Sequence, residues 1–170
     1  MDKVEKAASS FVDISKLNLT DFRNHSFTSI ETDKKFVAFV GRNGSGKTNV
    51  IEAISMFSSG KGFRGAQLSE QSNIKGNGGW SIFMEVKTAK GITKLGTGIG
   101  SSQMMEGKAR QCRVDGKFLK SPREFTNHVG IIWLTPQMDR LFIGQRTDRR
   151  KFFDKLVCLI ESSHEKNIKD

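Results

Sequence analysis

Hydrophobic and polar residues alternate along several short stretches of the chain, as they do in strands that bury one face. The stretches that predict such strands are residues 17–22, 27–31, 80–86 and 91–97. Two other runs, Phe36–Val40 and Gly130–Leu134, are apolar without alternation, which is typical of strands covered on both faces. Asp115-Gly116 lies between β-compatible flanks and indicates a type I′ hairpin. The pattern therefore predicts a sheet with both half-buried and fully buried strands.

Helices are predicted where apolar residues recur every three to four positions and not at every second position. Thr48–Phe57 carries apolar residues at positions i, i+1, i+4 and i+7 and follows the first fully apolar run, so we expect an amphipathic helix packed against that run. Ser121-Pro122 supplies the N-cap and first residue of a short helix. A last helix is expected to begin at Thr147 or Asp148. Its apolar stripe consists of Phe152, Phe153, Leu156, Val157 and Ile160.

The segment between the first apolar run and the expected helix fits the pattern GxxxxGK(S/T) without a mismatch. Its residues are Gly41, Arg42, Asn43, Gly44, Ser45, Gly46, Lys47 and Thr48. Glycines let the backbone curl so that its N–H groups point at a triphosphate, and the helix N-terminus adds positive potential. We expect Lys47 to reach the β- and γ-phosphates and the Thr48 hydroxyl to bind Mg²⁺. Because motif, strand and helix agree, ATP and Mg²⁺ are predicted as cofactors, in preference to a glycine-rich connector without function.

Hydrolysis would also require an acidic residue after a second apolar strand, to hold Mg²⁺ and organise the attacking water. The one candidate, Leu156–Glu161, continues the helical stripe of the preceding residues, so a helix face is the preferred interpretation. Leu68–Gln71 resembles part of the LSGGQ signature of ABC ATPases but lacks both glycines. No catalytic residue is therefore assigned, and ATP hydrolysis is not expected from this chain.

Positive charge is concentrated in one part of the chain. The formal net charge is +10, and Lys87–Arg123 holds nine basic residues against two acidic ones, a local +7. A basic, glycine-rich stretch beside a nucleotide-binding core suits contacts with a phosphate backbone, although a solvated hairpin surface would have the same composition. A second cluster, Arg146 with Arg149–Lys151, opens the last helix, where the helix dipole disfavours cations. No motif for reading base sequence is recognised.

Size and composition narrow the class of protein. A chain of 170 residues, 36% of them hydrophobic, is long enough for one folded domain. Its longest apolar runs are about five residues, far short of the ~20 that span a bilayer, and the charged N-terminus has no apolar signal core. We therefore expect a cytoplasmic protein. Cys112 and Cys158 are isolated, as are the three histidines, so neither a zinc site nor a disulfide framework is expected.

Six blocks of the sequence follow one another in a recognisable order. They are Leu19–Asn24, Gly41–Thr48, Gly60–Arg64, Arg113–Gly116, Thr135-Pro136 and Arg149–Asp154. Over residues 17–154 these blocks resemble the RecF family, bacterial ABC-type ATPases of recombinational DNA repair and replication-fork recovery. The resemblance implies an α/β P-loop NTPase fold: the N-terminal part of an ABC-type ATPase head, with a mixed sheet and an antiparallel β subdomain. It places Arg23 and Asn24 beside the nucleotide and gives Gln137 no role.

The same resemblance implies ATP-dependent dimerisation, binding to single-stranded and gapped duplex DNA, cooperation with RecO and RecR, and a part in the response to DNA damage, including the SOS response. It also implies that this chain is incomplete, because family members are much longer and carry their signature and Walker B acids in the C-terminal half. The expected divisions are an N-terminal extension at 1–15, the N-terminal part of the ATPase lobe at 16–145, and the truncated start of a helical second lobe at 146–170.

Two alternatives to an ATP-binding repair protein stay open at this point. The first is an inactive fragment, or a module that binds DNA passively through Lys87–Arg123. The second is another ABC-type ATP-binding subunit, such as that of a membrane transporter. Such a subunit would share Gly41–Thr48 but would ordinarily lack the Leu19–Asn24 block and would not need the basic hairpin.

Overall fold

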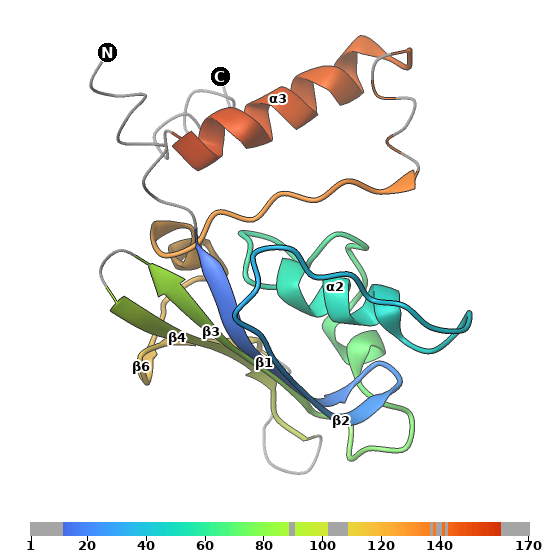
Figure 1. Cartoon of the computed structure of the whole chain (residues 1–170), viewed down its shortest axis with the longest axis vertical. Helices are drawn as coiled ribbons and strands as arrows, with labels where there is room; N and C mark the ends of the chain where they lie inside the picture. The colour runs from blue at the N-terminus through green and yellow to red at the C-terminus, as the bar shows by residue number, and fades with distance from the viewer. Residues whose placement is uncertain are drawn as a thin grey trace. The chain divides into compact units, whose positions relative to one another are not determined.

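The computed structural model describes residues 12–88, 91–101, 109–136, 138, 141 and 143–160. The chain divides into two compact units, Met1–Val129 and Gly130–Asp170. The first contains the sheet and the segment with the GxxxxGK(S/T) pattern, and the second contains one long helix (Figure 1). Several residues considered above lie outside the described part: most of the N-terminal extension, Gln137, Glu161 and His164.

The first unit is built on a six-stranded sheet in which every neighbouring pair of strands is antiparallel. The strands follow the order β2-β1-β3-β4-β5-β6 across the sheet. Their bounds are β1 Asp13–Phe22, β2 His25–Glu31, β3 Trp80–Thr88, β4 Gly91–Ile99, β5 Gln111–Val114 and β6 Lys117–Phe118. The four strands predicted from alternation are therefore confirmed.

One face of the sheet is covered by α2 (Lys47–Ser55), the helix that follows the GxxxxGK(S/T) segment (Figure 1). Leu19 of β1 and Leu95 of β4 lie on this face and are fully buried. Two 3-10 helices, η1 (Leu68–Gln71) and η2 (Pro122–Asn127), complete the unit. The ring of Phe57, just after α2, meets the ring of Phe125 in η2 edge to face, with centroids 5.2 Å apart. Burial of such side chains, each worth about 1.5–3 kcal/mol, holds α2 in place.

Both short turn motifs form as predicted. Asp115 and Gly116 have φ angles of 48° and 79°, the two positive values of a type I′ turn, and they join β5 to β6. Ser121 caps η2, because its hydroxyl oxygen accepts a hydrogen bond from the Arg123 N–H at 3.3 Å. Glu124 reaches back to accept from the Ser121 N–H at 3.1 Å, which completes a capping box. The expected short helix is thus confirmed in its 3-10 form.

The two fully apolar runs are not strands, and this corrects the prediction. Phe36–Val40 makes no backbone hydrogen bond to any other described residue, and Phe36 and Val40 are 95% and 93% exposed. Gly130–Leu134, in the second unit, belongs to no ladder either. An uninterrupted apolar run indicates burial on two faces, but a strand also needs a neighbouring strand to share its hydrogen bonds. The described part of the chain supplies neither run with such a neighbour.

The second unit contains α3 (Arg146–Ile160). This helix starts earlier than expected, so Thr147 and Asp148 lie in its first turn and do not cap it. Leu156–Ile160 is helical, which confirms the interpretation of this run as a helix face and not as a catalytic strand. No helix in the described ranges combines the length and the apolar character needed to cross a membrane.

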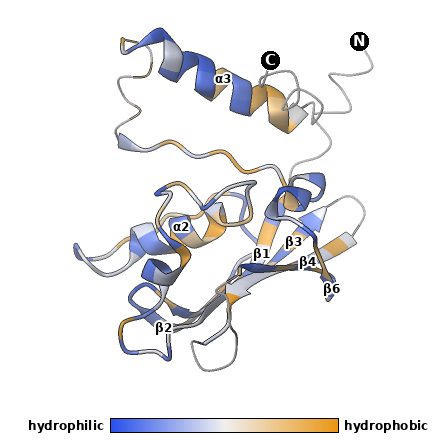
Figure 2. Cartoon of the chain, turned by 180° about the vertical axis from the view of Figure 1, so that it is seen from behind, coloured by the Kyte–Doolittle hydropathy of each residue, from blue (hydrophilic) through white to orange (hydrophobic). Residues whose placement is uncertain are grey.

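The apolar stripe of α3 is only partly covered within its own unit. Phe152 and Leu156 are half-buried, whereas Phe153 is 51% exposed. The Lys155 ammonium nitrogen lies 5.1 Å from the ring centroid of Trp133, a cation–π contact between the helix and the extended segment before it. Figure 2 shows hydrophobic residues along this segment.

A half-buried guanidinium joins the end of α2 to the sheet. Arg110, just before β5, donates hydrogen bonds to the backbone carbonyls of Met56 and Gly60 and to the Thr97 hydroxyl in β4. The Met56 carbonyl lies at the C-terminal end of α2, where the helix dipole makes a cation favourable. Burial lowers the pKa of the Arg110 guanidinium from its ordinary value, and the neighbouring Cys112 opposes this shift.

Replacing Arg110 with Met keeps a long side chain but removes all the donors, so that buried acceptors lose their partners. We expect the free energy of unfolding, measured by urea denaturation, to fall by about 2 kcal/mol. The matched control is Arg113→Met, at an exposed position of the adjoining strand, which should cost less than about 1 kcal/mol because it loses only an exposed contact with the Phe118 ring. An Arg110→Met variant as stable as the unchanged chain would contradict this account.

Candidate nucleotide-binding site

Residues Gly41–Thr48 form a tight loop that leads into α2. Gly44 and Gly46 have φ angles of 80° and 96°, in the left-handed region that favours glycine. Gly46 is the N-cap of α2, no side chain caps the helix, and its first turn holds no acidic residue. The first N–H groups of α2 therefore lack a side-chain acceptor, and the helix dipole makes this end attractive to an anion.

The Lys47 side chain lies back over the loop from the start of α2. Its ammonium group donates hydrogen bonds to the carbonyl oxygens of Gly41 and Arg42 at 2.6 and 2.7 Å, and the Ser45 hydroxyl is 3.5 Å away. These contacts hold the loop curled. The role of Gly41, Arg42 and Ser45 in this structure is to accept hydrogen bonds from Lys47 and so to shape the loop.

A hollow of about 400 Å³ adjoins the loop. It is lined by Asn43, Gly44, Gly46, Lys47, Thr48, Asn49 and Arg64. Its volume lies in the range of small-molecule sites. Five of the eight residues predicted to bind the nucleotide therefore border one cavity.

The turn between β1 and β2 packs directly against this loop. The Asn24 side-chain amide donates to the Gly44 carbonyl at 3.3 Å, and the Asn49 amide donates to Asn24 Oδ1 at 2.8 Å. His25 Nε2 lies 3.2 Å from the Gly46 carbonyl oxygen. A Cβ at Gly46 would lie only 2.5 Å from His25 Nε2, so this position requires glycine for space as well as for conformation. His25 thus has a structural role beside the loop that its isolated position in the sequence does not indicate.

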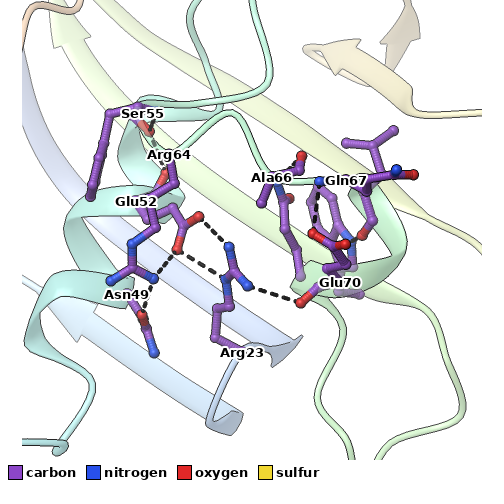
Figure 3. A network of polar contacts seen from close by, with 12 residues as sticks. Arg23, Asn49, Glu52, Ser55, Arg64, Ala66, Gln67 and Glu70 are labelled. Atoms are coloured by element: carbon purple, nitrogen blue, oxygen red, sulfur yellow. Dashed lines mark hydrogen bonds and ion pairs between the residues drawn. The ribbon is translucent and has the colours of Figure 1, made fainter.

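A buried carboxylate on α2 binds two arginines (Figure 3). The side chain of Glu52 is 0% exposed, and Arg23 approaches it with two nitrogens, Nη2 at 2.6 Å and Nε at 3.0 Å. Arg64 Nη1 donates to the same carboxylate at 2.8 Å and to Asn49 Oδ1 at 2.9 Å. Arg23 also donates to the Glu70 carbonyl at 2.9 Å. The β1–β2 turn, α2 and the loop before η1 are thereby joined through one group.

Arg64 reaches the hollow because its own loop is docked on the end of α2. The Phe63 N–H donates to the Ser55 hydroxyl at 3.0 Å, and Gly62 turns the chain with a φ of 75°. A Cβ at Gly62 would come within 2.9 Å of both Ser55 Oγ and Met56 Sδ. The hollow therefore has two cationic side chains on its lining, Lys47 and Arg64, from segments well separated in the sequence.

The buried face of α2 differs from the face expected from its apolar residues. The structure buries Val50, Glu52 and Ala53, while Ile51 is 46% exposed. The buried face of the helix therefore includes Glu52, whose carboxylate meets both arginines. No local signal marks Glu52, since a glutamate between apolar residues of a helix is normally exposed.

Two further expectations concern other motifs. Leu68–Gln71 forms η1, in which the Glu70 carboxylate accepts from the Gln67 N–H at 3.2 Å and so caps its own helix. This is a structural role and not that of an ABC signature. Within the described ranges, no group of three or more His, Cys, Asp or Glu residues is placed to hold a metal ion.

Replacing Glu52 with Gln removes the charge but keeps the shape of the side chain. Two guanidinium groups would then share one neutral amide, so we expect the free energy of unfolding to fall by about 3 kcal/mol, the lower part of the range for a broken buried pair, because both arginines keep some contact with water. Urea denaturation measures this change. Glu31→Gln, in an exposed pair with Lys16, is the matched control and should leave the urea midpoint close to that of the unchanged chain. Equal losses in the two variants would contradict the prediction.

A family model described as an AAA ATPase domain matches residues 13–161. Proteins called DNA replication and repair protein RecF, from Rhizobium leguminosarum bv. trifolii and Agrobacterium fabrum, are 39% and 41% identical to this chain over 159 and 161 residues. Each match covers 94% of this chain but 42% of the relative. The chain therefore spans about two-fifths of the length of these curated relatives.

Solved structures support the same fold. A structure described as the recombination mediator protein RecF with ATP in the RecFOR pathway has a TM-score of 0.75 and 24% identity, covering 91% of this chain and 40% of that chain. The SMC head domain from Thermotoga maritima has a TM-score of 0.56 and 19% identity, covering 78% and 51%. These structures confirm the expected ATPase-head fold, and the relatives confirm the resemblance to RecF. The chain belongs to the AAA ATPase domain family, and its curated relatives are RecF proteins.

Proposed function

We propose that this chain binds Mg·ATP through Gly41–Thr48 as the nucleotide-binding part of a DNA repair protein of the RecF type. The observation that carries the proposal is the convergence of three positive features on one hollow: the N-terminus of α2, Lys47 and Arg64. A triphosphate is the ligand that needs several donors and cations within so small a volume.

The residues of the loop would divide the work among them. The backbone N–H groups of the loop and of the start of α2 would bind phosphate oxygens, and Lys47 would exchange the carbonyls of Gly41 and Arg42 for the β- and γ-phosphates. The Thr48 hydroxyl, exposed at the border of the hollow, is an oxygen ligand of the kind that Mg²⁺ prefers. Bound Mg²⁺ would neutralise phosphate charge.

DNA is the second proposed ligand, in single-stranded or gapped duplex form. The local charge of +7 over Lys87–Arg123 supports it, as do the RecF relatives, whose printed name is DNA replication and repair protein. Dimerisation with ATP and cooperation with RecO and RecR belong to the same proposal, supported by the RecFOR pathway to which the solved RecF belongs. A role of this kind also calls for a cytoplasmic protein.

Lys47→Ala tests the nucleotide site. The variant loses a charge-assisted contact to phosphate, so we expect the affinity for Mg·ATP, measured by titration calorimetry, to fall by about 10- to 100-fold. Lys34→Ala is the matched control, because Lys34 is an exposed lysine that pairs with Asp33 outside the loop. The proposal fails if the unchanged chain and Lys47→Ala bind ATP equally weakly, which is the behaviour of an inactive fragment.

Thr48→Ala tests the metal ligand separately. ATP binding by the unchanged chain should strengthen when Mg²⁺ is added, and this gain should be largely lost in Thr48→Ala because the hydroxyl ligand is absent. Thr48→Ser keeps the hydroxyl and should keep the gain. A dependence on Mg²⁺ that is the same in all three proteins would exclude Thr48 as a ligand.

A further inference from the structure

The face of the sheet turned away from α2 carries a second hollow, with a volume of about 320 Å³. Residues on its lining include Ser81, Phe83, Gly96, Gly98, Gln111 and Arg113. Their neighbours along the strands, among them Met84, Leu95 and Cys112, are buried toward α2. Because side chains alternate between the faces of a sheet, this hollow opens on the opposite side from the core.

A row of side chains crosses four strands at this place. Phe83 of β3, Gly96 of β4, Arg113 of β5 and Phe118 of β6 are successive register partners. Gly96 contributes no side chain, so a gap separates Phe83 from Arg113, whose backbones are two strand spacings or about 10 Å apart. A Cβ at Gly96 would meet nothing nearer than Arg113 Cβ, at 4.0 Å, so the gap is not filled by a neighbour.

One wall of the gap is a stacked pair of flat groups. The Arg113 guanidinium carbon lies 4.0 Å from the ring centroid of Phe118, and this ring is 64% exposed. Phe83 forms the other wall and is half-buried. Aromatic rings and guanidinium planes offer stacking surfaces for another flat ring, and the gap between Phe83 and Arg113 leaves room for one.

The surroundings of the gap are cationic. Exposed basic side chains on this face of the sheet are Lys87 of β3, Lys94 of β4 and Arg113 of β5, and Lys120 and Arg123 are exposed in the segment after β6. Two carboxylates lie near these basic side chains: Glu85 pairs with Lys94 at 3.9 Å, and Asp115 Oδ1 accepts from the Lys94 N–H, so basic groups outnumber acidic ones here. A flat apolar gap with a cationic border complements a polymer that carries aromatic rings on a phosphate backbone.

We propose that single-stranded DNA binds across this outer face, with a base stacked in the gap between Phe83 and the Arg113–Phe118 pair and with phosphates on the surrounding lysines. The inference rests on the DNA-binding part of the proposed function and gives it a location. Single-stranded DNA is favoured over duplex because bases in a duplex are stacked on one another and do not offer a free face.

The test measures binding of a fluorescent oligothymidylate to the full chain by anisotropy, at several salt concentrations. Gly96→Val fills the gap without removing a charge, and the position accepts a β-branched residue because its surroundings are open. Phe118→Ala removes a stacking ring that is mostly exposed, so the sheet keeps its core. Each change should weaken binding at least about fivefold, the effect of losing stacking on one base.

Controls separate stacking from charge and from general surface effects. Phe27→Ala removes an equally exposed phenylalanine from β2, the strand at the opposite edge of the sheet from β6, and should leave the affinity for DNA unchanged. Lys94→Ala, on the same face as Gly96, should flatten the dependence of the logarithm of affinity on the logarithm of salt by about 0.7. Gly96→Val and Phe118→Ala should leave this slope unchanged, because they remove no phosphate contact. Duplex DNA of the same sequence should respond to Lys94→Ala but not to Gly96→Val.

The outcomes distinguish this inference from the function on which it rests. Binding by Gly96→Val and Phe118→Ala as tight as that of the unchanged chain would overturn the outer face as the DNA site and leave DNA binding itself intact. Absence of binding by the unchanged chain would overturn both. If Gly96→Val and Phe118→Ala bind DNA normally but self-associate less than the unchanged chain in sedimentation, the outer face makes protein contacts. This result would also overturn the inference.

Discussion

The buried carboxylate of Glu52 is the group on which the arrangement of the nucleotide loop depends. A carboxylate removed from water costs several kcal/mol unless cations and hydrogen bonds replace the lost solvent. Arg23 and Arg64 supply these replacements from opposite sides. Their backbone segments are therefore held at fixed positions against α2, and with them the Asn24 contact to the loop and the Arg64 side of the hollow. The Glu52 carboxylate thus holds together the β1–β2 turn, α2 and the loop before η1, which are separate in the sequence.

Much of the first unit could be predicted because its signals are local. Alternation along β1 and β3, the Asp115-Gly116 turn and the spacing of Gly41–Thr48 each depend on a few consecutive residues. The same locality explains what was missed. His25, Glu52 and Arg64 acquire their roles from partners 12 to 29 positions away, and their own neighbours in the sequence carry no sign of it.

The two apolar runs show where prediction of strands from the hydrophobic pattern fails. Phe36–Val40 has the composition of a strand buried on both faces, and Phe36 is nevertheless almost fully exposed. Composition records what a segment is suited to contact, whereas a ladder depends on a second segment with free hydrogen-bonding groups. The apolar composition of Phe36–Val40 indicates a segment suited to a strand, but the prediction that it pairs with a neighbouring strand was wrong.

Phe36–Val40 also bears on solubility. Four of its five uncharged residues have high β-propensity, and Phe36, Val37 and Val40 are exposed. Without proline, such a segment has the character of those that recruit strands from other molecules. Because this segment leads directly into the nucleotide loop, cross-molecular pairing here would immobilise Gly41 and its neighbours in an aggregate. Precipitation and loss of ligand binding would then be one event, governed by protein concentration and not by the affinity of the site.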